Sequence, residues 1–263
     1  MTESGRLAGT WYMAVGDGPP LVYLPPFGIH NKPLEGWQQK ASLRAVAGLA
    51  RHFRVYWINR KEGLAAGATV ADLAGDAAAA IQERFTEPVD VLGYSHGALV
   101  SLALAADRPQ LVRRLVVGGL AHRLTPAEQA TCANFVRAAE AGRPRAAVAA
   151  LARGAVENPL GRTVVGALAW LAGPAGAGRS WDPHDAVVAL RAVLDADLAD
   201  RLPSIHAPTL LIAGERDVNC PPTYVAEMLA ALPDAQAVRV PGKGHGGTML
   251  APAFTAEIMK FLT

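Results

Sequence analysis

The 263-residue sequence has little cysteine, little charge and no long uninterrupted hydrophobic run. Its two cysteines, Cys132 and Cys220, are too few for a disulfide scaffold or a cysteine-based zinc site, and they fit a reducing cytosol. Charged residues make up 18% of the chain and hydrophobic residues 51%, whereas an average soluble protein has about 25% charged residues. This composition supplies a large apolar core and excludes a disordered chain.

The sequence also lacks membrane and export signals. Residues 163–178, a stretch of sixteen residues without a charge, are broken by glycine and proline, whereas a spanning helix needs roughly 18 or more apolar residues. Residues 1–16 have no apolar core of the kind a signal peptide needs. We therefore expect no membrane span and a cytoplasmic location. The enrichment in alanine is what a GC-rich bacterial genome produces, so a bacterial source is expected.

Charge and histidine spacing limit the choice of partner. The net charge of +2 comes from scattered Lys and Arg, and no basic block is longer than a pair such as Arg143 and Arg145. This pattern gives little reason to invoke nucleic acid. No two histidines lie at helical ligand spacing, and no carboxylate cluster with metal-ligand spacing occurs. We expect a small-molecule substrate, no metal, no cofactor, and a monomer or homodimer.

Short apolar runs alternate with segments of helical spacing along most of the chain. Continuous apolar strands separated by amphipathic helices predict an α/β fold with a doubly wound, mostly parallel sheet covered on both faces. The expected strands are residues 21–24, 53–58, 89–92, 115–117, 209–213 and 237–240, and the expected helices are residues 41–51, 70–85, 98–107, 224–232 and 254–262.

The alternation stops between residues 119 and 200. This stretch contains Ala-rich helical segments, such as residues 126–141 and 145–156, and no convincing strand. Because it separates two core strands, we expect it to lie over their C-terminal ends, where open α/β sheets bind ligands. The sequence thus predicts a core of residues 1–118 and 201–263 and a helical cap of residues 119–200.

One motif carries chemistry. Residues 93–97 read Gly-Tyr-Ser-His-Gly and lie between an expected strand and an expected helix. This is the G-x-S-x-G pattern in the context it requires, where a tight turn holds the serine in a strained conformation and exposes its hydroxyl. The pattern predicts that Ser95 is a nucleophile.

A serine nucleophile needs a base, and the base needs an acid that fixes its tautomer. Asp217 follows the expected strand 209–213, and His245 lies in a glycine-rich loop after the expected strand 237–240. The order Ser95, Asp217, His245 is that of a nucleophile-elbow hydrolase and differs from trypsin-like and subtilisin-like proteases. The alternatives to Asp217 are Glu215 and a cluster of three aspartates, namely Asp195, Asp197 and Asp200.

With these residues, the sequence resembles the α/β-hydrolase fold family over nearly its whole length. The resemblance rests on residues 93–97, residues 214–217, the loop around His245, and residues 16–24 with the turn that follows them. It implies a Ser-Asp-His triad and an oxyanion hole made of two backbone N–H groups.

The resemblance assigns those two N–H groups to His96, which follows the nucleophile, and by position to Phe27 in the early loop. This chain departs from the family there, because Pro25 and Pro26 stand where many relatives have His-Gly. Proline has no N–H to donate, so only Phe27 or a later amide can serve.

Four further residues are candidates for substrate binding. His30 lies near the early loop, Tyr94 precedes the nucleophile, and Trp170 and Trp181 lie in the expected cap. If these aromatic residues line the pocket, the substrate is apolar or cyclic, since ligand pockets are mostly apolar with a few placed polar groups.

Three functions are compatible with this pattern. The first is a serine hydrolase that cleaves an ester, thioester or lactone through an acyl-enzyme. The second keeps the triad but acts as an acyltransferase, a C–C hydrolase or lyase, or a cyclisation enzyme of a biosynthetic pathway. The third is a binding protein that retains the pocket without catalysis.

Overall fold

The computed structural model describes residues 2–31, 36–154, 156, 158–173 and 182–263. It contains an eight-stranded sheet with the order β1-β2-β4-β3-β5-β6-β7-β8. Strands β3 to β8 are mutually parallel, whereas β2 pairs antiparallel with both β1 and β4. The strands are β1 Glu3–Leu7, β2 Thr10–Val15, β3 Pro20–Leu24, β4 Arg54–Ile58, β5 Val89–Tyr94, β6 Val112–Gly118, β7 Thr209–Gly214 and β8 Ala235–Val240. The predicted mostly parallel α/β sheet is confirmed.

The hairpin β1–β2 at one edge of the sheet was not predicted. Its turn residues Ala8 and Gly9 both have positive φ, 46° and 82°, as a two-residue hairpin turn requires. β1 is only partly buried and contains Gly5, so it lacks the continuous apolar run that marks the central strands. The hairpin extends the parallel sheet by an antiparallel edge.

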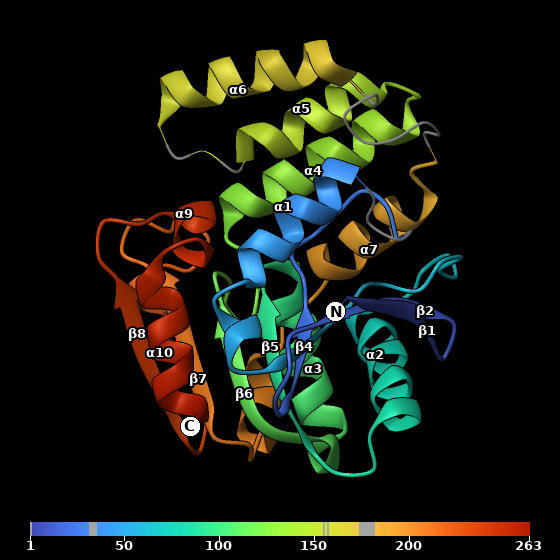
Figure 1. The fold of residues 1–263 in the computed structure, drawn as a ribbon. Coiled ribbons are helices and arrows are strands. Elements are labelled where there is room, and N and C mark those ends of the chain that lie inside the picture. The colour runs from blue at the N-terminus through green and yellow to red at the C-terminus, as the bar shows by residue number, and fades with distance from the viewer. Residues whose placement is uncertain (1, 32–35, 155, 157, 174–181) are drawn as a thin grey trace.

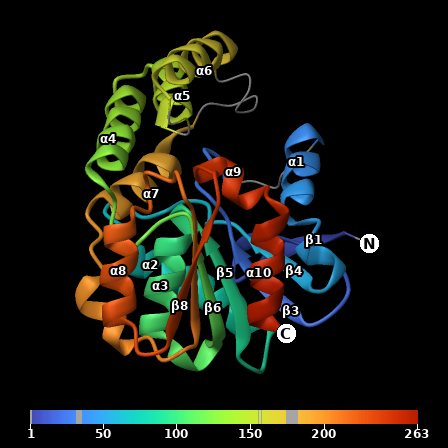
Figure 2. The ribbon, with the colours of Figure 1, turned by 90° about the vertical axis from the view of Figure 1, so that its left-hand side faces the viewer.

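Helices cover both faces of the sheet (Figures 1 and 2). On one face lie α2 (Val70–Arg84), α3 (His96–Asp107) and α8 (Pro222–Ala231). On the other face lies α10 (Pro252–Leu262), together with the end of α1 (Gly36–Val46) and the short helix η1 (Leu49–Arg51). The single helix predicted over 41–51 is therefore two elements, which the structure separates at Gly48. The remaining short elements of the core are η2 Pro109–Leu111, η4 Ala199–Ser204 and α9 His245–Met249.

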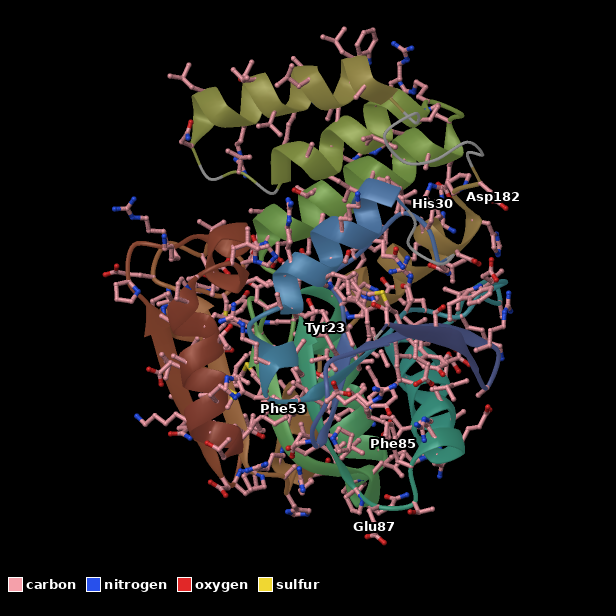
Figure 3. All side chains as sticks on the ribbon, viewed as in Figure 1. Tyr23, His30, Phe53, Phe85, Glu87 and Asp182 are labelled. Atoms are coloured by element: carbon pink, nitrogen blue, oxygen red, sulfur yellow. The ribbon has the colours of Figure 1, made fainter. Side chains whose placement is uncertain are left out.

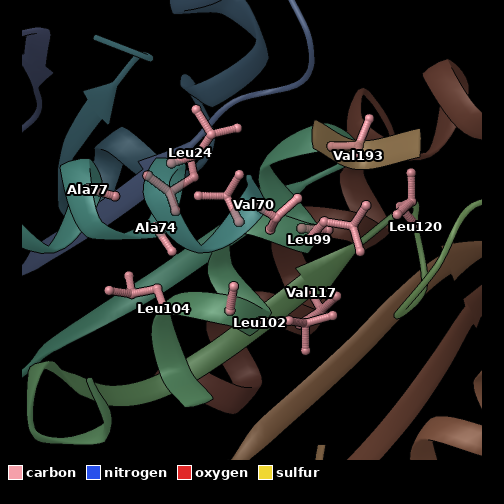
Figure 4. Packing of buried hydrophobic residues seen from close by; sticks show 14 of the residues in the cluster. Leu24, Val70, Ala74, Ala77, Leu99, Leu102, Leu104, Val117, Leu120 and Val193 are labelled. Atoms are coloured by element: carbon pink, nitrogen blue, oxygen red, sulfur yellow. The ribbon is translucent and has the colours of Figure 1, made fainter. Parts of the chain in front are cut away.

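The described residues between β6 and β7 form the α-helices α4 Pro126–Glu140, α5 Pro144–Gly154, α6 Pro159–Ala172 and α7 His184–Leu194. They lie above the sheet in Figure 1, with α6 outermost. An isolated bridge between Arg123 and Asp197 joins the two ends of this segment. Val193 of α7 belongs to the same buried cluster as Leu99 of α3 and Leu120 after β6 (Figure 4), so this helix is packed into the main core.

Candidate active site

The strand-to-helix turn at Ser95 has the geometry that the motif predicts. All residues of β5 are buried, and α3 begins at His96 directly after Ser95. Ser95 has φ 55° and ψ −122°, a strained conformation for a residue other than glycine. A Cβ on Gly97 would collide with the carbonyl oxygen of Leu24 at the end of β3. Glycine at this position therefore lets the first turn of α3 approach β3 closely.

Ser95, His245 and Asp217 form one hydrogen-bonded row. The Nε2 atom of His245 lies 3.0 Å from Ser95 Oγ, and its Nδ1 atom lies 3.1 Å from Asp217 Oδ2. The Asp217 side chain is fully buried and also accepts the backbone N–H of Asn219 at 3.0 Å. A carboxylate only accepts, so His245 donates from Nδ1 and presents the Nε2 lone pair to Ser95.

The other carboxylates weighed against Asp217 have different partners or positions. Glu215 accepts the backbone N–H of Gly242 at 2.8 Å, and Asp197 lies 3.6 Å from Arg123. Asp195 ends α7 and Asp200 lies in η4. The carboxylate that receives the Nδ1 hydrogen bond of His245 is Asp217.

Above Ser95 lies a cavity of about 430 Å³, which we call the catalytic cavity. Ser95 and His245 lie at its floor, and most of its other lining residues are apolar side chains from the core and from α4, α5 and α7. Those apolar residues include Phe27, Ile29, Leu99, Leu120, Leu124, Leu151, Leu190 and Val193. The arrangement can hold an apolar group against the Ser95 hydroxyl.

Of the residues predicted to form the oxyanion hole, both Phe27 and His96 line the catalytic cavity, with ring centroids 5.8 Å apart. Burial and the nearby charge of Arg60 lower the pKa of His96 to about 3, so its imidazole is neutral. The Nε2 atom of His96 is buried and has no hydrogen-bond partner among the described residues.

Of the four residues predicted to bind substrate, the three that the structure describes do not line the catalytic cavity. Tyr94 is buried, and its hydroxyl donates to the backbone carbonyl of His245 at 2.5 Å. This hydrogen bond fixes the backbone at His245. Trp170 is 48% exposed on α6, which lies farthest above the sheet in Figure 1. His30, labelled in Figure 3, and Trp170 are not among the residues lining the catalytic cavity. Trp181 lies outside the described residues.

Sequence reasoning missed a buried arginine that fixes the early loop. The Arg60 guanidinium donates to the carbonyl of Gly28 and to Asn31 Oδ1, the latter at 2.7 Å, and it lies over the Phe27 ring. Asn31 in turn donates to Asp185 of α7 at 3.1 Å. No local pattern could reveal this network, because its members are far apart in the chain.

Glu128 is a second missed residue. It lines the catalytic cavity from α4 and is only 9% exposed. Its Oε2 atom accepts the backbone N–H of Thr125 at 3.0 Å in a capping box. Burial raises the pKa of the Glu128 carboxyl to about 7. The Thr-x-x-Glu signal could have located this side chain at the start of α4, but not in the cavity.

The raised pKa of Glu128 predicts a pH-dependent stability. The unfolded chain loses this proton near pH 4.5 and the folded chain near pH 7, so stability falls as pH rises through that interval. The loss is about 3 kcal/mol in total, because each pKa unit corresponds to about 1.4 kcal/mol. Glu128→Gln should abolish this loss while keeping a capping-box side chain.

Urea unfolding of the wild type and of Glu128→Gln at pH 5 and pH 8 measures this effect. The variant should gain stability relative to the wild type as pH rises, while Glu87→Gln, an exposed site, should follow the wild type. Parallel pH profiles for Glu128→Gln and the wild type would contradict the assignment.

Within the described part of the chain, no cluster of three or more His, Cys, Asp or Glu side chains is arranged to hold a metal ion, and no helix has the length and hydropathy of a membrane span.

Comparison with known proteins gives several relatives of similar length. "Putative non-heme bromoperoxidase BpoC" of Mycobacterium tuberculosis H37Rv is 30% identical, over 94% of each chain. The pimeloyl-[acyl-carrier protein] methyl ester esterase of Nitrosomonas europaea is 26% identical, over 90% of this chain and 92% of its own. Among solved structures, the enol-lactonase of Burkholderia xenovorans LB400 superposes with a TM-score of 0.77 at 22% identity, covering 99% of each chain.

The fold of the enol-lactonase is thus shared by this chain. Residues 21–258, which include Ser95, Asp217 and His245, match the model of the alpha/beta hydrolase family. The sheet, the nucleophile turn and this match agree, and the chain belongs to the alpha/beta hydrolase family.

Proposed function

We propose that the protein is a serine hydrolase that cleaves an ester, thioester or lactone of a largely apolar molecule through an acyl-enzyme intermediate. The observation that carries this proposal is the hydrogen-bonded row from Asp217 through His245 to Ser95 at the floor of an apolar cavity. Relatives named as a methyl ester esterase and as a succinate-derivative hydrolase support hydrolysis.

In the first half of the reaction, His245 Nε2 takes the Ser95 proton as Oγ attacks the carbonyl carbon. The buried Asp217 carboxylate stabilises the imidazolium that forms. His245 then returns the proton to the leaving group, and the acyl group remains on Ser95. In the second half, His245 activates water, which releases the acid and restores Ser95.

The negative charge on the carbonyl oxygen needs preorganised donors. We assign this role to the backbone N–H groups of His96 and Phe27, both of which line the cavity. The N-terminal end of α3 adds a positive dipole at the same place. The contacts of Arg60 to Gly28 and to the Phe27 ring hold the early loop in position.

We further propose that residues 119–200 act as a cap over a core of residues 1–118 and 201–263. Side chains of α4, α5 and α7 line the cavity together with Ser95. A cap in this position restricts access to Ser95 and selects the acyl group by shape. Whether water or another acceptor receives the acyl group depends on what this cap admits.

Burst kinetics with product analysis tests the proposal. With 4-nitrophenyl butanoate, we expect release of about one equivalent of nitrophenol per enzyme before steady state, followed by butanoic acid as the product. The acid should remain the main product when an alcohol or a thiol competes with water. Predominant transfer to the competitor would favour an acyltransferase, and absence of turnover on all esters, thioesters and lactones would favour a binding protein.

A further inference from the structure

A second cavity, of about 630 Å³, lies along α4 and α5. It adjoins the catalytic cavity, because four residues line both: Ala127, Thr131, Gly154 and Arg162. The two cavities therefore lie next to each other near the start of α4 and the end of α5. We call the second cavity the arginine groove, for Arg137, Arg143, Arg153 and Arg162 in its lining.

The charged side chains among the described lining residues of the arginine groove are all positive. Four arginines line it, and none of the described lining residues is acidic. Two other arginines of the same region are paired, Arg191 with Glu140 and Arg123 with Glu227. Within the described part of the chain, the four groove arginines form no ion pair.

The groove arginines keep most of their donors available. A guanidinium carries five N–H donors. Among the described residues, Arg137 donates to Asn134 at 3.2 Å and Arg162 to the carbonyl of Val156 at 3.0 Å. Like charges around one concavity repel each other unless an anion lies between them, and arginine forks match phosphate oxygens in geometry. The groove is therefore suited to a multiply charged anion.

The length of the groove sets the length of the ligand. Ala127 lies at the junction of the two cavities, and Arg137 lies ten residues further along α4. At about 1.5 Å per residue, the far end of the groove lies about 15 Å from that junction. An anion held there is remote from the scissile bond, so a compact anionic ester cannot reach both places.

We propose that the arginine groove binds the phosphorylated arm of an elongated acyl thioester, while the acyl chain occupies the catalytic cavity. This inference rests on the proposed function and names its substrate class. The apolar catalytic cavity suits the acyl chain, and the basic groove suits the leaving group. Phosphate is favoured over a single carboxylate because four guanidinium groups surround the groove.

Paired thioesters test the assignment. Butanoyl-coenzyme A and S-butanoyl-N-acetylcysteamine carry the same acyl group and the same thioester, but only the first carries phosphates. In the variant Arg137→Gln/Arg143→Gln, the ratio of kcat/KM for the first to that for the second should fall about tenfold or more. Added salt should lower the same ratio in the wild type. Arg108→Gln is the control: Arg108 caps the C-terminal end of α3, whereas Ser95 lies at the N-terminal end. This variant should keep the wild-type ratio.

Binding of coenzyme A itself separates this proposal from the proposed function. Calorimetry should show binding to the wild type and at least tenfold weaker binding to the double variant, whether or not any thioester is hydrolysed. An unchanged substrate ratio together with unchanged coenzyme A binding would overturn the groove assignment. It would also be overturned by selectivity for carboxylate-bearing esters without coenzyme A binding.

Discussion

Ser95→Ala is expected to lower kcat/KM for a hydrolysed ester by about 10⁶-fold, the order of loss found when a triad nucleophile is removed. The variant keeps His245 and the oxyanion donors but has no oxygen that can form an acyl-enzyme. The backbone N–H of residue 95, which donates to the carbonyl of Gly118 at 2.8 Å, remains in place. The fold should therefore survive, and the residual rate should reflect binding and the oxyanion hole alone.

Steady-state kinetics with 4-nitrophenyl butanoate measures the loss, and circular dichroism checks the fold. Ser101→Ala is a matched control, because Ser101 lies in α3 and its hydroxyl donates only to the carbonyl of Ala98 among the bonds of the described residues. That control should retain activity within a few-fold. Retention of more than about one hundredth of wild-type turnover by Ser95→Ala would contradict the nucleophile assignment.

Asp217→Asn should lower kcat by about 10⁴-fold with little change in KM. An asparagine amide can donate to Nδ1 of His245, which then places the proton on Nε2, facing Ser95 Oγ. The histidine can no longer accept the serine proton. The buried negative charge that stabilises the imidazolium is lost as well.

The matched control is Glu215→Gln, two residues away on the same turn. Glu215 accepts the backbone N–H of Gly242, and glutamine can accept the same bond, so activity should stay within a few-fold of wild type. A loss smaller than tenfold for Asp217→Asn, or a larger loss for Glu215→Gln, would place the acid of the triad elsewhere.

The central strands and the nucleophile turn were predictable because their signals are local. β5 is fully buried, is apolar apart from Asp90, and leads into the glycines and serine of the turn. Asp217 and His245 each follow a strand by a few residues. In a parallel sheet these strand ends meet at one edge, so order along the chain was enough to place the three side chains near each other.

The edge hairpin and the lining of the site were less predictable. The turn at Ala8 and Gly9 lacks the Asn-Gly or Asp-Gly signal of a tight hairpin. The contacts of Arg60 with the early loop, and of that loop with α7, join segments far apart in the chain. The outward position of Trp170 depends on how α6 packs on α5, which helical periodicity alone does not determine.

Covalent trapping tests whether Ser95 is an activated nucleophile. A fluorophosphonate added in slight excess should add one phosphonyl group per chain, and peptide mass spectrometry should place it on Ser95. The rate should fall by several orders of magnitude in His245→Gln, because the base is gone. Absence of an adduct, an adduct on another residue, or equal labelling rates in the wild type and His245→Gln would show that Ser95 is not a nucleophile activated by His245.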